Sequence, residues 1–134
     1  MVVDDNPGVL EFVASILEMT KRAEVSRFHC ATEALEAFKA APEKFQFVVT
    51  DFEMPGLNGI ELGRRLLAAS PCARILLVTG STAITEAEAR RWGFCGMLPK
   101  PFSATALWQA AETAGVSTSR ENNFSKHEAA SLAA

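Results

Sequence analysis

Short apolar runs alternate with longer segments of helical period along this chain. The third and fourth runs are β-branched and apolar without alternation, which is typical of strands that are buried on both faces. We predict strands at residues 1–3, 24–28, 45–50, 74–78 and 95–98.

The segments between these runs carry the signals with which helices begin. Four of them start with a residue that commonly caps a helix N-terminus. The fifth is predicted at residues 32–40 and is closed by Pro42. The four predicted starts are Asn6 before Pro7, Asn58 with Glu61, Thr85 with Glu88, and Ser103 between Phe102 and Leu107.

This order of elements predicts an α/β fold of the (βα)₅ type, a doubly wound parallel sheet with helices on both faces. Such a sheet binds its ligands beyond the carboxyl ends of its strands, near the switch in strand order. Polar residues of the right kind stand at four predicted strand ends. They are Asp4, Asp5, Asp51, Thr79 and Lys100.

Each of these residues alone also fits a purely structural role, such as a turn carboxylate, an exposed lysine or a threonine chosen for β-propensity. Together they indicate chemistry, because three neighbouring carboxylates repel one another unless a cation is present. Mg²⁺, or Mn²⁺, prefers oxygen ligands and keeps waters that a phosphate can replace.

The reaction indicated by this set is attack of a carboxylate on phosphorus, which gives an aspartyl phosphate. We predict Asp51 as the nucleophile and Asp5 as a direct metal ligand, with Asp4 binding partly through water. The backbone carbonyl of Glu53 would complete the protein ligands. Thr79 and Lys100 would hold the transferred oxygens.

Composition argues against several other classes of protein, namely nucleic-acid-binding, membrane-spanning and cysteine-ligated metal proteins. The net charge is −3 and the charges are interspersed, which argues against nucleic-acid binding. No apolar run approaches the roughly 20 residues that span a bilayer, and no signal peptide is evident, so we expect a cytoplasmic domain. The cysteines lack metal-ligand spacing and are expected to be reduced and mostly buried. They are Cys30, Cys72 and Cys95.

Four segments, taken in order and at their spacing, resemble the response-regulator receiver family over residues 1 to about 115. They are VVDD at 2–5, TDFEMPGLNG at 50–59, LVTG at 77–80 and LPKPF at 98–102. The resemblance implies a flavodoxin-like sheet of order 2-1-3-4-5 in a receiver domain at residues 1–116. Residues 117–134 are rich in Ser, Ala and charged residues, and this composition predicts a flexible or weakly helical tail.

The resemblance further implies that Asp51 is phosphorylated by the phosphohistidine of a histidine kinase or phosphotransfer domain, with Mg²⁺ required. It implies a cis bond before Pro101. It also implies a phosphoacceptor rather than a turnover enzyme, with slow self-phosphorylation and self-dephosphorylation. Output, through a homodimer or a downstream protein, is expected at the face of the fourth helix, fifth strand and fifth helix.

Two features depart from the family pattern. Met97 stands where the family usually has an aromatic ring that moves together with the threonine, here Thr79, so the conformational switch would differ. The first strand is short for the family, which we expect to weaken the sheet. The positions of Glu53 and Ser81 flank the phosphoryl group in receivers and are expected to tune its hydrolysis.

Three alternatives stay open at this point. The domain could be a phosphorylation-independent pseudo-receiver that serves as a binding scaffold. It could be a Mg²⁺-dependent phosphohydrolase, although Asp51-Phe52-Glu53 lacks the Asp-x-Asp pattern of the haloacid-dehalogenase type. It could also be the C-terminal receiver of a membrane-tethered hybrid histidine kinase. Of Trp92 and Phe94, we expect at least one to be core and an exposed one to mark a partner contact.

Overall fold

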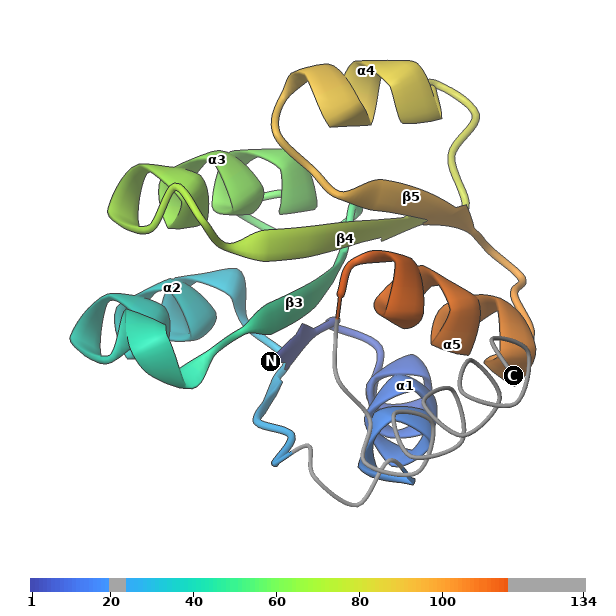
Figure 1. Ribbon diagram of the computed structural model, residues 1–134, viewed down its shortest axis with the longest axis horizontal. Helices are drawn as coiled ribbons and strands as arrows, with labels where there is room; N and C mark the ends of the chain where they lie inside the picture. Colours follow the sequence, from blue (N-terminus) through green and yellow to red (C-terminus); the bar gives the residue numbers. More distant parts are fainter. Residues whose placement is uncertain (20–23, 116–134) are drawn as a thin grey trace, which may run out of the picture.

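A parallel sheet of five strands forms the centre of the molecule (Figure 1). The computed structural model describes residues 1–19 and 24–115. The strands lie in the order β2-β1-β3-β4-β5, which confirms the predicted topology. They are β1 (Val2–Val3), β2 (Arg27–Phe28), β3 (Phe47–Asp51), β4 (Arg74–Thr79) and β5 (Gly96–Pro99).

Helices cover both faces of this sheet (Figure 1). Two of them, α1 and α5, pack on one face, and the other three pack on the opposite face. None of the described helices has the length and hydropathy needed to cross a bilayer. The helices are α1 (Pro7–Glu18), α2 (Ala31–Ala40), α3 (Gly59–Ala69), α4 (Glu86–Arg91) and α5 (Ala104–Thr113), with a 3₁₀ turn η1 at Pro42–Lys44.

The central strands supply both hydrophobic cores. Successive side chains of a strand point to opposite faces, so Val48 and Leu77 join the core under α2, α3 and α4. Val49 and Val78 join the core under α1 and α5. This explains why these runs are apolar without alternation: both faces of the strand are buried.

The predicted N-caps form as expected. The side chains of Asn6, Asn58, Thr85 and Ser103 each accept hydrogen bonds from backbone N–H groups in the first turn of their helices. Helix α2 differs, because its cap residue Cys30 makes no side-chain cap bond.

Three sequence predictions were wrong in detail. The second strand is only Arg27–Phe28, an edge strand on which Arg27 pairs with Glu11 at 2.6 Å and with Glu18. The third strand starts two residues later than predicted, because η1 precedes it. The cysteines are not mostly buried: Cys72 is exposed beyond the end of α3, and the other two are half-buried. The predicted tail at 117–134 lies outside the described residues.

Phe94 settles the question about the two aromatic residues. It is 3% exposed and packs against α3, where Gly63 leaves room for its ring. A Cβ atom at position 63 would overlap that ring. Trp92, by contrast, is 40% exposed beyond the end of α4.

Met1 is buried next to β3. The Met1 amine donates a hydrogen bond to the carbonyl oxygen of Phe47 at 2.9 Å, and Val49 N–H donates to the Met1 carbonyl. Met1 thereby continues the pairing of the short strand β1 with β3. Burial lowers the pKa of this amine from 8.0 to about 6.

For a polypeptide that begins at Met1 with a free amine, stability should therefore depend on pH. The unfolded chain binds a proton below pH 8 that the folded chain resists until about pH 6. The free energy of unfolding should fall by about 2 kcal/mol as the pH drops from 8 to 6. Urea unfolding across this range measures the change.

A matched control extends the chain by two apolar residues before Met1. The amine then becomes an amide that donates the same hydrogen bond without a charge, and this part of the pH dependence should vanish. An equal pH dependence in both proteins would contradict the assignment.

Candidate functional site

The five predicted polar residues gather at one edge of the sheet. Asp4 and Asp5 follow β1, Asp51 ends β3, Thr79 ends β4 and Lys100 follows β5. Because all strands are parallel, their carboxyl ends meet on the same side. This edge also holds the switch in strand order, since β1 and β3 are neighbours at the centre of the sheet.

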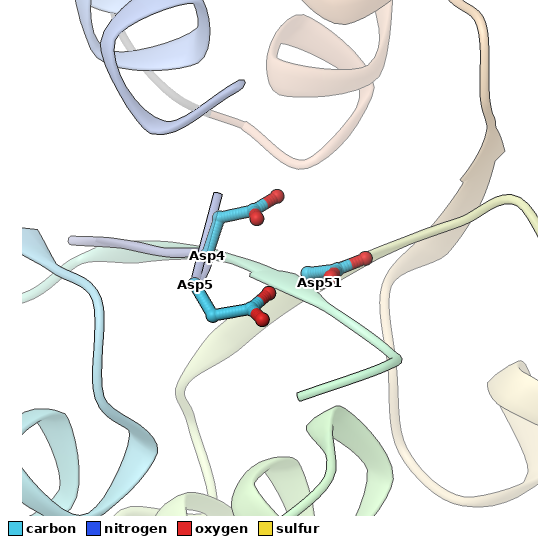
Figure 2. A group of neighbouring side chains, drawn as sticks. All are labelled: Asp4, Asp5 and Asp51. Carbon is cyan, nitrogen blue, oxygen red and sulfur yellow. The ribbon is translucent and has the colours of Figure 1, made fainter. Parts of the chain in front are cut away.

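Three carboxylates form a close cluster at this edge (Figure 2). Asp4, Asp5 and Asp51 each offer an oxygen, and these oxygens lie within 4.8 Å of one another. Asp4 and Asp51 are only 3% and 6% exposed, whereas Asp5 is exposed. Asp5 is therefore the member of the cluster that is open to solvent.

Lys100 is the cation that the chain itself brings to the cluster. Its Nζ lies 3.0 Å from Asp51 Oδ1 and 3.4 Å from Asp4 Oδ2. Partial burial works to lower the pKa of Lys100, but the hydrogen bond to Asp51 and the two negative charges together raise it. Lys100 therefore stays charged and bridges the two buried carboxylates.

One lysine leaves the cluster with an excess of negative charge. Burial, followed by the charge of Asp51, raises the pKa of Asp4, although the Asn6 N–H bond and Lys100 oppose this. The available donors are all carboxylate oxygens, which are the ligands that hard divalent cations prefer. The residues present therefore fit Mg²⁺ or Mn²⁺.

Thr79 is held in a hydroxyl-to-amide chain that the sequence analysis missed. This residue is 1% exposed, and its Oγ1 accepts a hydrogen bond from Ser81 N–H at 2.9 Å. Ser81 Oγ in turn accepts from Ala83 N–H at 3.1 Å. The spacing of hydroxyl residues at 79 and 81 was the available signal, since Ser and Thr often bond to the backbone two residues on.

Met97 lies on the same sheet face as Thr79. It pairs with Leu77 in the β4–β5 register, and Thr79 stands two residues further along β4. Met97 is half-buried against the core under α2, α3 and α4. The next feature of this segment is the peptide bond between Lys100 and Pro101, which is cis.

The loop after β3 is fixed close to Asp51. Phe52 N–H donates to the carbonyl of Val78, and Gly59 N–H donates to the carbonyl of Phe52 at 2.8 Å. A Cβ atom at position 59 would overlap the Asp51 carbonyl, so only glycine permits this approach. The Glu53 side chain is exposed in this loop.

Comparison with known proteins identifies the family. The family model for the response regulator receiver domain matches residues 1–112. The chain belongs to the response regulator receiver family. It is 35% identical over 114 residues to the C4-dicarboxylate transport transcriptional regulatory protein DctD of Rhizobium meliloti, which covers 84% of this receiver. The chain spans 24% of the length of DctD, and about half or less of the other curated relatives it matches.

Solved receivers have the same fold. A receiver domain protein from Clostridium thermocellum superposes with a TM-score of 0.77 at 26% identity, covering 92% of this chain and 95% of that one. The beryllofluoride-activated NtrC4 receiver domain dimer gives 0.76 at 25% identity, covering 84% and 92%. The protein is therefore a signalling domain of the two-component type.

The charge imbalance predicts a conflict between stability and ion binding. In the absence of divalent ions, Asp4→Asn should raise the free energy of unfolding by about 0.5 to 2 kcal/mol, because it removes one of three repelling charges. With Mg²⁺ at 100 times its dissociation constant, the wild type should gain about 2.7 kcal/mol. The variant should gain much less.

Urea unfolding with and without Mg²⁺ measures both effects. Glu43→Gln removes an exposed carboxylate from η1 and is the matched control; it should change stability by no more than about 0.5 kcal/mol in either buffer. A destabilised Asp4→Asn protein in metal-free buffer would show that the carboxylates do not repel as argued.

Proposed function

We propose that this receiver accepts a phosphoryl group on Asp51 and changes conformation in response. The observation that carries the proposal is the contact of Lys100 with the buried Asp51 inside a cluster of three carboxylates. Asp4, Asp5, Asp51 and the backbone carbonyl of Glu53 would hold Mg²⁺ or Mn²⁺. The ion would neutralise charge on the phosphoryl oxygens during transfer.

The proposed donor is the phosphohistidine of a histidine kinase or of a phosphotransfer domain. An Asp51 carboxylate oxygen attacks phosphorus, the phosphorus–nitrogen bond breaks, and its electron pair returns to the histidine ring. Lys100 Nζ is already within reach of Asp51 and can follow the negative charge onto a phosphoryl oxygen. No water is consumed in this step, and the product stays on the protein, so we regard the domain as a phosphoacceptor and not a turnover enzyme.

The proposed conformational change starts at Thr79. Within the described residues, its buried hydroxyl accepts from Ser81 N–H but finds no acceptor for its own proton. A phosphoryl oxygen on Asp51 would supply one, and turning toward it would disturb the bonds made by Ser81 and Ala83, which stand in the segment between β4 and α4. Met97 is flexible enough to fill the space that Thr79 leaves.

Output is proposed at the face formed by α4, β5 and α5, and the segment with Ser81 and Ala83 directly precedes α4. The related NtrC4 receiver is a dimer in its beryllofluoride-activated form. A homodimer or a downstream protein would use this face here, with no direct role for nucleic acid or membrane. We place the domain in the cytoplasm, where such donors act, and treat residues 1–116 as the receiver unit.

Binding of beryllofluoride, a mimic of the phosphoryl group, tests the proposal directly. In the presence of Mg²⁺, the wild type should bind it saturably, with amide NMR shifts that spread from Asp51 to Ser81 and α4. Asp51→Asn should show none of these shifts, because it lacks the carboxylate that bonds to beryllium.

Lys100→Arg keeps the positive charge but not the compact ammonium, and should bind more weakly while remaining folded. Absence of binding by the folded wild type would favour the pseudo-receiver scaffold. Turnover of a generic phosphate ester would instead favour a phosphohydrolase.

Glu53 and Ser81 are proposed to tune the lifetime of the phosphoryl group. Glu53 is exposed two residues beyond Asp51, and its charge would orient an attacking water. After labelling with a small phosphodonor, Glu53→Gln should change the half-life of aspartyl phosphate several-fold, whereas Glu43→Gln should not. Equal half-lives in the three proteins would remove Glu53 from this role.

A further inference from the structure

The turn between β1 and α1 ties one buried carboxylate to the start of a helix. Asn6 N–H donates to Asp4 Oδ1 at 2.9 Å. The Asn6 side-chain oxygen accepts from Gly8 N–H at 2.9 Å and from Val9 N–H at 3.1 Å, and the Asn6 backbone carbonyl accepts from Leu10 N–H. A single residue therefore contacts Asp4 through its backbone N–H, and α1 through its side chain and its backbone carbonyl.

These contacts treat the two oxygens of Asp4 differently. Oδ1 is engaged by the Asn6 amide at a normal hydrogen-bond length, whereas Oδ2 has only the longer 3.4 Å contact with Lys100. The amide bond thus fixes the rotation of the carboxylate and leaves Oδ2 on the side of Lys100. That is also the side of Asp51, which the same lysine contacts.

We propose that the backbone amide of Asn6 is a positioning group for the cation site, holding Asp4 with Oδ2 turned toward the cluster. This inference rests on the proposed role of Asp4 in binding Mg²⁺ or Mn²⁺. Partners that orient a metal ligand commonly change metal affinity by ten-fold or more when they are lost.

Two independent constraints orient the Asn6 N–H toward Asp4 Oδ1. Pro7 restricts the residue before it to extended conformations, and Asn6 has φ −86° and ψ 115°. The cap bonds to Gly8 and Val9 hold the same residue from the other side. Asp5, by contrast, is exposed and can adapt to an ion. The pair would then combine one fixed ligand with one adjustable ligand.

The alternative hypothesis is that Asn6 acts only as the N-cap of α1 and has no role in the cation site. The two hypotheses can be separated, because the cap resides in the side chain and the positioning group in the backbone. Asn6→Ala removes the cap and keeps the N–H. Asn6→Pro removes both, and its ring stands where the N–H met Asp4 Oδ1. A proline ring accepts a φ close to the one found here.

The experiment measures Mn²⁺ affinity by electron paramagnetic resonance, and stability by urea unfolding, for the wild type and both variants. Asn6→Ala should lower the urea midpoint but bind Mn²⁺ within two-fold of the wild type. Asn6→Pro should unfold near the midpoint of Asn6→Ala and bind Mn²⁺ about ten-fold more weakly.

Equal Mn²⁺ affinity of Asn6→Pro and Asn6→Ala would overturn the inference. If Asn6→Pro does not fold, Asn6→Ala/Pro7→Ala releases both constraints on the amide, and its affinity should fall below that of Asn6→Ala; equal affinity would again overturn it. A wild type that binds no Mn²⁺ would instead refute the proposed cation site itself, independently of the variants.

Discussion

Repulsion among three carboxylates at the edge of the parallel sheet is the interaction that the rest of the structure has to offset. Parallel strands bring Asp4, Asp5 and Asp51 to one point, and two of them are almost fully buried. Lys100 follows the edge strand β5, and its side chain reaches the cluster and offsets part of the negative charge. The remaining charge is what makes the site receptive to a divalent ion and to the phosphoryl group that such an ion accompanies.

The surrounding structure holds these groups without relying on their mutual attraction. The strands pack against a hydrophobic core on each face, and this packing keeps the strand ends in place although the carboxylates repel one another. The loop after Asp51 is fixed by backbone bonds and by the close approach that Gly59 permits. The packing of the two cores thereby offsets the cost of bringing the carboxylates together, as is common where function opposes stability.

Most of the fold and the members of the site could be predicted because their causes are local in sequence. Apolar runs, caps at Asn58, Thr85 and Ser103, and polar residues at strand ends are all visible in residue types. What could not be predicted depends on partners distant in sequence or on the backbone. The length of β2 is set by pairing with β1, and the bond of Asn6 N–H to Asp4 is made by an atom that every non-proline residue has.

The contact between Gly63 and Phe94 has a consequence for how this sequence can diverge. The ring of Phe94 occupies the volume that any larger residue at 63 would need, so α3 and the segment leading into β5 share one space. Position 63 can enlarge without overlap only after position 94 has become smaller, whereas the reverse order passes through an overpacked protein. Related receivers are therefore expected to differ at these two positions together, in an order that packing alone dictates.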